Sequence, residues 1–399
     1  MIDRRTFTAA GVASALPIAA TPASAQPRAW TSILEEARGQ TVYFAAWAGS
    51  DKINDYLAWA GEQLRVQAGV KLEHVKVNET AEVVRRVQAE KQAGRNDGTV
   101  DLMWINGENF VRMKQGGLLF GPFAEALPNY RFVDVQGKPT TRVDFGEPVD
   151  GMEAPWGMAQ LTFFGDRTRV AAPPRSARAM LAWLRDNPGR FTYPKPPQFH
   201  GTTFVKQLLL ELNPDDTAVN QPVTAQAFER TMKPVWAWLD EARPLLWRKG
   251  RSFPANDAEL ARLLGDGELA IALTFNPNAA ANLVASKALA TTVYAWQHER
   301  GTIGNTHFVA IPFNARAKAG AQVVADFLLS PRAQAHKADV NVWGDPTVLA
   351  AAALSSEDRA RFEAKVPGGL EHPAPALREP HVSWVEAIEK GWAQRYAVA

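Results

Sequence analysis

Tryptophans and small polar residues gather where short apolar runs of this sequence stop. Trp47-Ala48-Gly49-Ser50 ends one such run, and the stretch from Trp104 to Asn109 ends another. An indole ring offers a flat face to a sugar, a heterocycle or an organic cation, and a cation over tryptophan gains about 0.5–2 kcal/mol. Residues of these types at such positions favour binding of a small molecule over catalysis.

The candidate binding residues share a place at a predicted strand end, at the junction of two halves of the chain, or at a predicted helix start. They are Trp47, Gly49, Ser50, Trp104, Asn106, Glu108, Asn109, Trp156, Thr202, Thr203, Asn276 and Trp296. Helices expected after Ser50, Glu108 and Thr203 would offer N–H groups to an anionic or carbonyl-bearing part of a ligand. Glu108 could neutralise a cationic part. A single tryptophan is more often core than ligand platform, but several loops converging from both halves favour a cleft. The tryptophan faces together with Glu108 favour a thiamine-like or other cationic organic solute.

Signals for catalysis or for a metal are weak. The chain has no cysteine, which excludes disulfides, thiolate nucleophiles and Cys-ligated zinc. Its seven histidines lack ligand spacing and its six tyrosines are dispersed, so we expect no metal site and no cofactor. Glu147, Asp150 and Glu153 are close enough in sequence to supply an acid/base pair, although carboxylates on a loop are usually only solvated. An exported hydrolase or lyase and a ferric-ion-binding protein remain the alternatives.

Alternating strands and helices must position these residues. Apolar runs at 41–47, 70–77 and 100–105 predict strands, and the stretches between them carry apolar residues at helical spacing. This alternation with short connections indicates an α/β fold with a doubly wound, mostly parallel sheet, on which ligands bind beyond the carboxyl ends of the strands. The second half repeats the theme, with helices expected from Ser176, Thr202 and Thr224 and strands at 269–275, 291–296 and 308–312.

Composition and the N-terminus predict an exported protein. The chain has 399 residues, and 44 Lys plus Arg nearly balance 42 Asp plus Glu, which argues against nucleic-acid binding. Arg4-Arg5 precedes a weakly apolar stretch that ends in Ala23-Ser24-Ala25, a pattern typical of a twin-arginine signal peptide over 1–25 cleaved near Ala25. No later stretch approaches 18 uninterrupted apolar residues. We therefore expect a soluble periplasmic protein.

Several strings resemble the YnjB-type family of bacterial ABC-importer solute-binding proteins. They are Trp104 to Phe110, Gly116 to Phe123, Glu153 to Gly157, Phe191 to Pro194 and Phe199 to Phe204, with the helix Ala325 to Leu329 before Ser330-Pro331. The resemblance spans the chain from about Trp30 onward. It implies the type II periplasmic-binding-protein fold, no enzymatic activity, and delivery of a small-molecule ligand to ABC permease subunits in the inner membrane.

That layout leads to a hypothesis for the domains. The first lobe would comprise 36–155 plus 300–340 and the second lobe 160–295, with a helical tail over 341–399 packed across both. Strands near 156–164 and 291–301 would act as hinges, and a ligand would favour closure by contacting both lobes. We expect a monomer.

Overall fold

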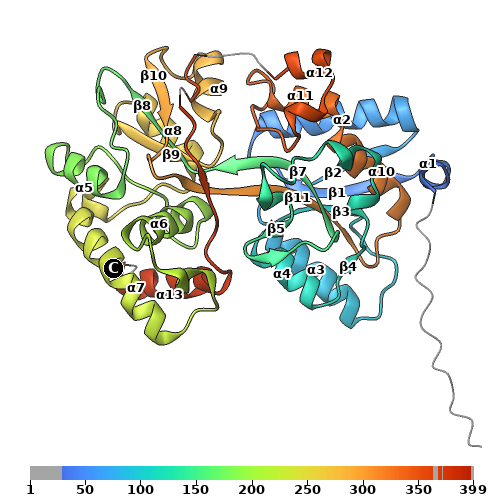
Figure 1. Cartoon of the computed structure of the whole chain (residues 1–399), viewed down its shortest axis with the longest axis horizontal. Coiled ribbons are helices and arrows are strands. Elements are labelled where there is room, and N and C mark those ends of the chain that lie inside the picture. Colours follow the sequence, from blue (N-terminus) through green and yellow to red (C-terminus); the bar gives the residue numbers. More distant parts are fainter. Residues whose placement is uncertain (1–28, 363–366, 371, 397–399) are drawn as a thin grey trace, which may run out of the picture.

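The computed structural model describes residues 29–362, 367–370 and 372–396, so the signal peptide expected over 1–25 lies outside it. Two lobes lie side by side, and the strands β7 (Glu153–Gln160) and β11 (Thr302–Pro312) run between them (Figure 1). This is the two-lobed α/β arrangement expected from the sequence.

The first lobe is built on a mixed sheet. Its path runs β12 (Ala376–Leu377), β11, β3 (Leu102–Ile105), β1 (Thr41–Trp47) and β2 (Lys71–Val77), and β4 (Leu119–Phe120) and β7 also pair with β11. The pairs β1–β2 and β1–β3 are parallel, whereas β11 is antiparallel to β3, β4 and β7. The βα rhythm of the sequence therefore produces the parallel part, and the returning strand β11 makes the sheet mixed.

Helices cover both faces of this sheet because β1 buries alternate residues on opposite sides. Val42, Phe44 and Ala46 pack in one core with α2, and Ala45 packs in another with α3. The elements of this lobe are α1 (Trp30–Ala37), α2 (Asp51–Ala68), α3 (Thr80–Gln92), α4 (Glu108–Gln115), α10 (Lys318–Leu329), α11 (Pro331–Ala338), three 3-10 turns (Ala124–Ala126, Pro128–Phe132, Pro139–Thr141) and the hairpin β5 (Val143–Asp144) with β6 (Glu147–Pro148). Ser330 ends α10, and its side chain then accepts the Ala333 N–H to begin α11.

The second lobe differs from the expected parallel sheet. Its strands β8 (Thr162–Asp166), β9 (Ile271–Thr274) and β10 (Val293–Trp296) pair in the order β10-β8-β9, and both pairs are antiparallel. The reason is that β8, on which the chain enters this lobe, lies between β9 and β10. The latter two share one direction and are joined through α9 (Ala279–Ala285), so the crossover unit is present but its strands are not neighbours.

Helices surround the small sheet of the second lobe. They are α5 (Ala177–Asp186), α6 (Phe199–Leu212), α7 (Ala225–Ala242), α8 (Asp257–Gly265) and α9, with 3-10 turns at Thr217–Asn220, Arg243–Leu245 and Trp247–Gly250. Asn256 caps α8 by accepting the Glu259 N–H at 3.0 Å, as the sequence predicts.

The second crossing strand lies later in the chain than expected. Residues 291–301 do not cross, because β10 pairs within the second lobe and the chain then turns at Gly301, whose φ is +111°. The crossing strand is β11, and the Leu161 N–H donates to the Ile303 carbonyl at 2.8 Å where the two connections meet.

The tail contacts both lobes. Its first part, with a 3-10 turn at Ala351–Ala353 and α12 (Ser356–Ala360), places Trp343, Val348 and Leu349 in a core of the first lobe. Its last part forms β12 against β11 and then α13 (Ser383–Tyr396), which buries four side chains in the core of the second lobe: Trp384, Ile388, Trp392 and Tyr396.

Candidate functional site

Trp47 ends β1 and is 37% exposed. The indole folds back over Gly49, where any Cβ would collide with it, so glycine is required for this ring position. Ser50 stands at the N-cap of α2 as expected, but its side chain accepts no capping hydrogen bond. Instead Asn54 holds the turn by donating to the Ala48 carbonyl at 3.2 Å. An exposed indole thus lies at the carboxyl edge of the first-lobe sheet.

The start of α4 is acidic. Gly107 precedes the helix with φ +61°, and its N–H donates to the buried carboxylate of Asp144 at 2.6 Å. Glu108 is exposed, Asn106 is partly exposed, and the buried Oδ1 of Asn109 has no hydrogen-bond partner among the described residues. Burial raises the pKa of Asp144 well above its ordinary range, the Gly107 bond opposes this, and Glu108 is among the charges that add to it.

The helix α6 begins three residues earlier than predicted. Gln198 caps it by accepting the N–H groups of His200 and Gly201, so these N–H groups already have a partner from the chain. Thr202 and Thr203 consequently lie inside the first turns of the helix. Thr202 Oγ1 donates to Glu389 at 2.9 Å, and the fully buried Thr203 Oγ1 has no partner among the described residues.

Residues of α4, α6, α13, β5 and the tail form a group of charges that we call the acidic centre: Glu108, Asp144, Glu379 and Glu389, together with Lys206. Lys206 and Glu379 are 2% and 3% exposed, and the ammonium donates to Glu379 Oε2 at 2.6 Å. Burial raises the pKa of Glu379, Lys206 opposes this rise, and the charge of Glu108 adds to it. Four carboxyl groups that act on one another therefore lie where the lobes face each other, and Lys206 interacts with two of them, Glu379 and Glu389.

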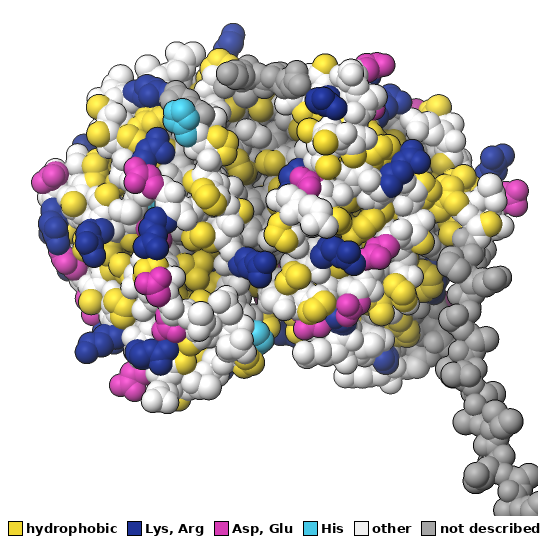
Figure 2. Space-filling view, viewed as in Figure 1, with side chains coloured by type: hydrophobic (Ala, Val, Ile, Leu, Met, Phe, Trp, Pro, Cys, Tyr) yellow, Lys and Arg dark blue, Asp and Glu magenta, His cyan; other side chains and the backbone are white. Residues whose placement is uncertain are grey.

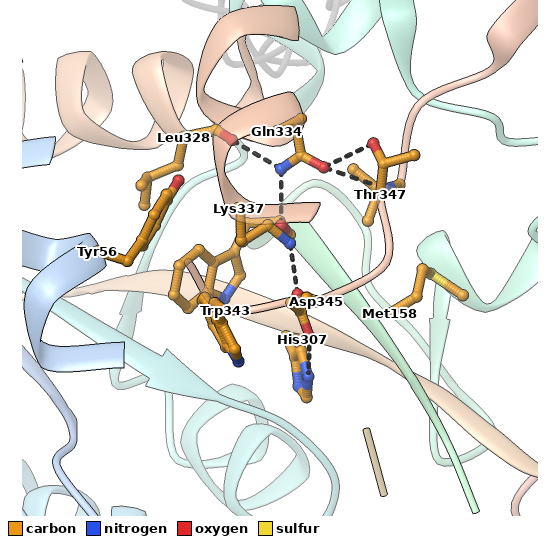
Figure 3. A network of polar contacts seen from close by, with 12 residues as sticks. Tyr56, Met158, His307, Leu328, Gln334, Lys337, Trp343, Asp345 and Thr347 are labelled. Atoms are coloured by element: carbon orange, nitrogen blue, oxygen red, sulfur yellow. Dashed lines mark hydrogen bonds and ion pairs between the residues drawn. The ribbon is translucent and has the colours of Figure 1, made fainter. Parts of the chain in front are cut away.

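Asn276 lies on the other side of the crossing strands, near the start of α9. Its amide donates to the carbonyl of Trp343, a first-lobe residue, at 3.4 Å. The segment around Trp343 is held by Asp345, which contacts both Lys337 and His307 (Figure 3). Trp104 is partly exposed, and its ring lies 5.0 Å from the His307 ring. This side of the interface is aromatic and hydrogen-bonded rather than acidic.

Two predicted ligand platforms are core residues instead. Trp156 is fully buried among Phe44, Trp104 and Trp343. Trp296 is 1% exposed and its indole N–H donates to the Pro174 carbonyl at 3.1 Å. Trp156 is a candidate because it lies at the junction of the two halves and Trp296 because it ends a predicted strand, but the packing of each lobe covers both rings. Neither offers a face to a ligand in this conformation.

The carboxylates considered for catalysis do not form an acid/base pair. Glu147 and Asp150 both accept from Lys114 at 2.7 Å near the surface. Glu153 is fully buried, and neither of its oxygens has a hydrogen-bond partner among the described residues. Burial raises the pKa of Glu153 well above its ordinary range, and Asp144 adds to the rise.

Sequence reasoning missed Lys206, Glu379 and Phe199. A lysine between Phe204-Val205 and the apolar run Leu208-Leu209-Leu210 was the available signal for the first of these. Glu379 lies 173 residues from Lys206 and carries no local signal. Phe199, 39% exposed at the start of α6, was hidden because the helix was predicted to begin later.

Figure 2 shows a hollow in the surface between the two lobes. Positive and negative side chains are interspersed over the face seen in this view. Within the described ranges, no three histidine, aspartate or glutamate side chains are grouped in a way that could hold a metal ion. No helix in the described part of the chain is both long and apolar enough to cross a membrane.

Comparison with known proteins gives a consistent picture. Residues 59–365 match the model of the family described as bacterial extracellular solute-binding protein. The chain is 45% identical over 368 residues to protein YnjB of Escherichia coli strain K12, covering 92% of this chain and 94% of that protein.

Solved structures resemble the fold at low sequence identity. Apo ferric ion-binding protein A of Pasteurella haemolytica has a TM-score of 0.63 at 12% identity, covering 90% of this chain and 98% of that one. The spermidine/putrescine ABC transporter substrate-binding protein of Streptococcus pneumoniae has a TM-score of 0.60 at 14% identity, with coverage of 90% and 98%. Both likenesses concern the type II periplasmic-binding-protein fold.

Proposed function

The chain belongs to the family of bacterial extracellular solute-binding proteins, and from that premise we propose that it captures a cationic organic solute between its lobes for an ABC permease. The resemblance to the YnjB-type family is confirmed by 45% identity over most of the chain. Family membership supports solute binding for an ABC transporter; the cationic, thiamine-like character of the solute is our proposal.

The observation that carries the proposal is the acidic centre. Its one lysine is already paired with Glu379, which leaves the exposed carboxylate of Glu108 for a ligand. Glu389 is partly exposed, and burial raises its pKa. The buried Oδ1 of Asn109 on α4 and Oγ1 of Thr203 on α6 have no hydrogen-bond partner among the described residues, and such atoms gain most from a hydrogen-bond donor. A protonated amine or a quaternary nitrogen beside donor groups suits this set.

The exposed rings of Trp47 and Phe199 support the organic part of the solute. One belongs to each lobe, and each is more than a third exposed although it is a large aromatic side chain. Flat apolar faces of this kind bind heterocycles or alkyl chains, and a cation near tryptophan adds attraction. We propose the periplasm as the place of capture, on the basis of the family and of the leader pattern in the sequence.

Thermal unfolding against a solute panel tests the proposal. Thiamine, putrescine, spermidine and choline are compared with glucose, glutamate and fructose 6-phosphate. A ligand at about 100 times its Kd stabilises by about 2.7 kcal/mol, which moves the midpoint visibly. We expect a cation to raise the unfolding midpoint, and Glu108→Gln to reduce this rise. Glu229→Gln, at an exposed position on α7, is the control. A shift with the anionic or neutral compounds alone contradicts the cationic solute.

A further inference from the structure

Two backbone carbonyls of the first lobe accept hydrogen bonds from the second lobe. Trp343 is 5% exposed in a first-lobe core, and Gly344 follows it in a turn. Asn278, which directly precedes α9, donates from its side chain to the Gly344 carbonyl at 2.8 Å. Asn282 and Asn276 both donate to the Trp343 carbonyl. One turn of one lobe thus receives three asparagine amides of the other.

The turn is shaped for this approach. Gly344 has φ +78°, and a Cβ at this residue would lie 2.8 Å from Asn282 Oδ1, so a side chain is excluded by both conformation and space. The Gly344 N–H donates to the carbonyls of Lys337 and Asp339, each at 2.9 Å. Both carbonyls that face α9 are therefore held in place by the end of α11.

Asp345 fixes the turn from the first-lobe side (Figure 3). Its carboxylate pairs with the fully buried ammonium of Lys337 and lies 3.2 Å from His307 Nε2 on the crossing strand β11. The Lys337 ammonium also lies 5.7 Å and 5.4 Å from the ring centroids of Trp156 and Trp343. Gly157 stands opposite on β7, and a Cβ there would collide with the Asp345 carboxylate.

We propose that the turn from Trp343 to Asp345, here called the tether, holds the two lobes together in the absence of solute, with Asp345 as its positioning residue. Each hydrogen bond across the interface favours the arrangement in which the lobes are closed at this turn, and each must break before the lobes part here. The asparagine amides at the start of α9, one of which sequence reasoning assigned to a ligand, are occupied by the protein itself.

The tether concerns the resting state and requires no particular solute. Its bearing on uptake rests on the proposed function, because a solute enters an interlobe cleft only while the lobes are apart. The population of the separated form then scales the association rate.

Pulsed electron paramagnetic resonance tests the proposal without any ligand. The chain contains no cysteine, so a thiol-specific spin label attaches only to the two cysteines that are introduced. Gln67→Cys on α2 with Arg178→Cys on α5 reports the distance between lobes, since both residues are exposed. Gln67→Cys with Arg85→Cys on α3 reports the first lobe alone.

The decisive variant is Asn278→Ala with Asn282→Ala. We expect longer interlobe distances and a ratio of separated to closed forms about tenfold higher, the factor that corresponds to about 1.4 kcal/mol. Asn187→Ala is the matched control, because its side-chain amide, directly after α5, donates to the Trp183 carbonyl of the same lobe. An unchanged interlobe distribution overturns the tether, and so does broadening of the intralobe pair to the same degree, which would indicate general loosening.

The positioning role has its own variant. Lys337→Met with Asp345→Leu removes the buried pair as a whole, which is better tolerated than leaving one charge behind. We expect it to lengthen the interlobe distances as the asparagine variant does, with the intralobe distance unchanged. If only the asparagine variant lengthens them, Asp345 does not position the turn.

Discussion

The ammonium of Lys206 on α6 lies 4.7 Å from the ring centroid of Phe145, so a buried charge of the second lobe rests against an aromatic ring of the first. The same ammonium is paired with Glu379. In Figure 1, α6 and β5 lie below the crossing strands and α9 lies above them, so the lobes contact each other on both sides of their connection.

Lys206→Met should destabilise the protein by about 3–5 kcal/mol at pH 7, because it leaves the Glu379 carboxylate buried without its partner. Lys206→Met combined with Glu379→Leu should restore most of this loss. Urea unfolding of the three proteins measures the difference. Arg65→Met, which breaks an exposed pair with Glu62, is the control and should change the unfolding free energy far less. Equal losses in the single and double variants would argue against the pairing.

Glu153→Gln should stabilise the protein increasingly as the pH rises. Burial, with Asp144 adding to it, raises the folded-state pKa of Glu153 well above its ordinary value of 4.5, so folding favours the protonated form. The stability that this group contributes is fully present below pH 4.5 and is lost as the pH rises from there towards the raised pKa.

Urea unfolding at pH 5, 6 and 7 measures this effect. The wild-type free energy of unfolding should fall relative to Glu153→Gln by up to about 1.4 kcal/mol per pH unit. Glu229→Gln, at an exposed position, should track the wild type at every pH. A constant difference between wild type and Glu153→Gln across this range would show that the carboxyl does not change its protonation on folding.

The two kinds of tryptophan should separate stability from binding. Trp296→Ala removes a fully packed ring and should cost about 3–5 kcal/mol of unfolding free energy. Trp47→Ala removes an exposed ring and should cost much less, but it should reduce the thermal shift produced by the bound solute. Differential scanning fluorimetry with and without solute compares both variants. A Trp47→Ala protein that retains the full shift would remove this ring from the site.

Gly157→Ala should destabilise the protein by about 1–3 kcal/mol, because the added methyl group collides with the Asp345 carboxylate beside the Lys337 ammonium. Gly61→Ala is a suitable control. Gly61 lies inside α2, and its Cβ would meet Leu72 only at an ordinary contact distance of 3.4 Å, so the change should stabilise by up to about 1 kcal/mol. Chemical unfolding of both variants checks the contrast.

Local patterns of the sequence predict the helices and strands of this fold better than they predict which strands pair with one another. The strand from Thr41 to Trp47 and the helix after Ser50 agree with the structure because each rests on neighbouring residues and on hydrophobic period. The antiparallel order in the second lobe depends on β8 lying between β9 and β10, strands more than 100 residues further along the chain, and no local pattern encodes that.

The candidate site, too, could be predicted only in part, because local patterns do not show which side chains the fold covers. Position at a strand end correctly brings Trp47 to the surface, but it does not distinguish Trp47 from Trp296, whose ring is covered by packing within its own lobe. Glu379 pairs with a lysine far away in the sequence. Asp345 lies in a turn that carries no recognisable sequence motif. Pairs of single side chains that lie far apart in sequence can be identified only in the folded structure.

The position of α13 has a consequence for the order in which this protein takes shape. The core of the second lobe includes Trp384, Ile388 and Trp392, yet its sheet is complete at Trp296. During synthesis the sheet therefore leaves the ribosome well before the helix that covers part of its core. Until that helix emerges, part of the apolar core of the second lobe stays exposed. A chaperone would therefore find the largest apolar binding surface during this interval.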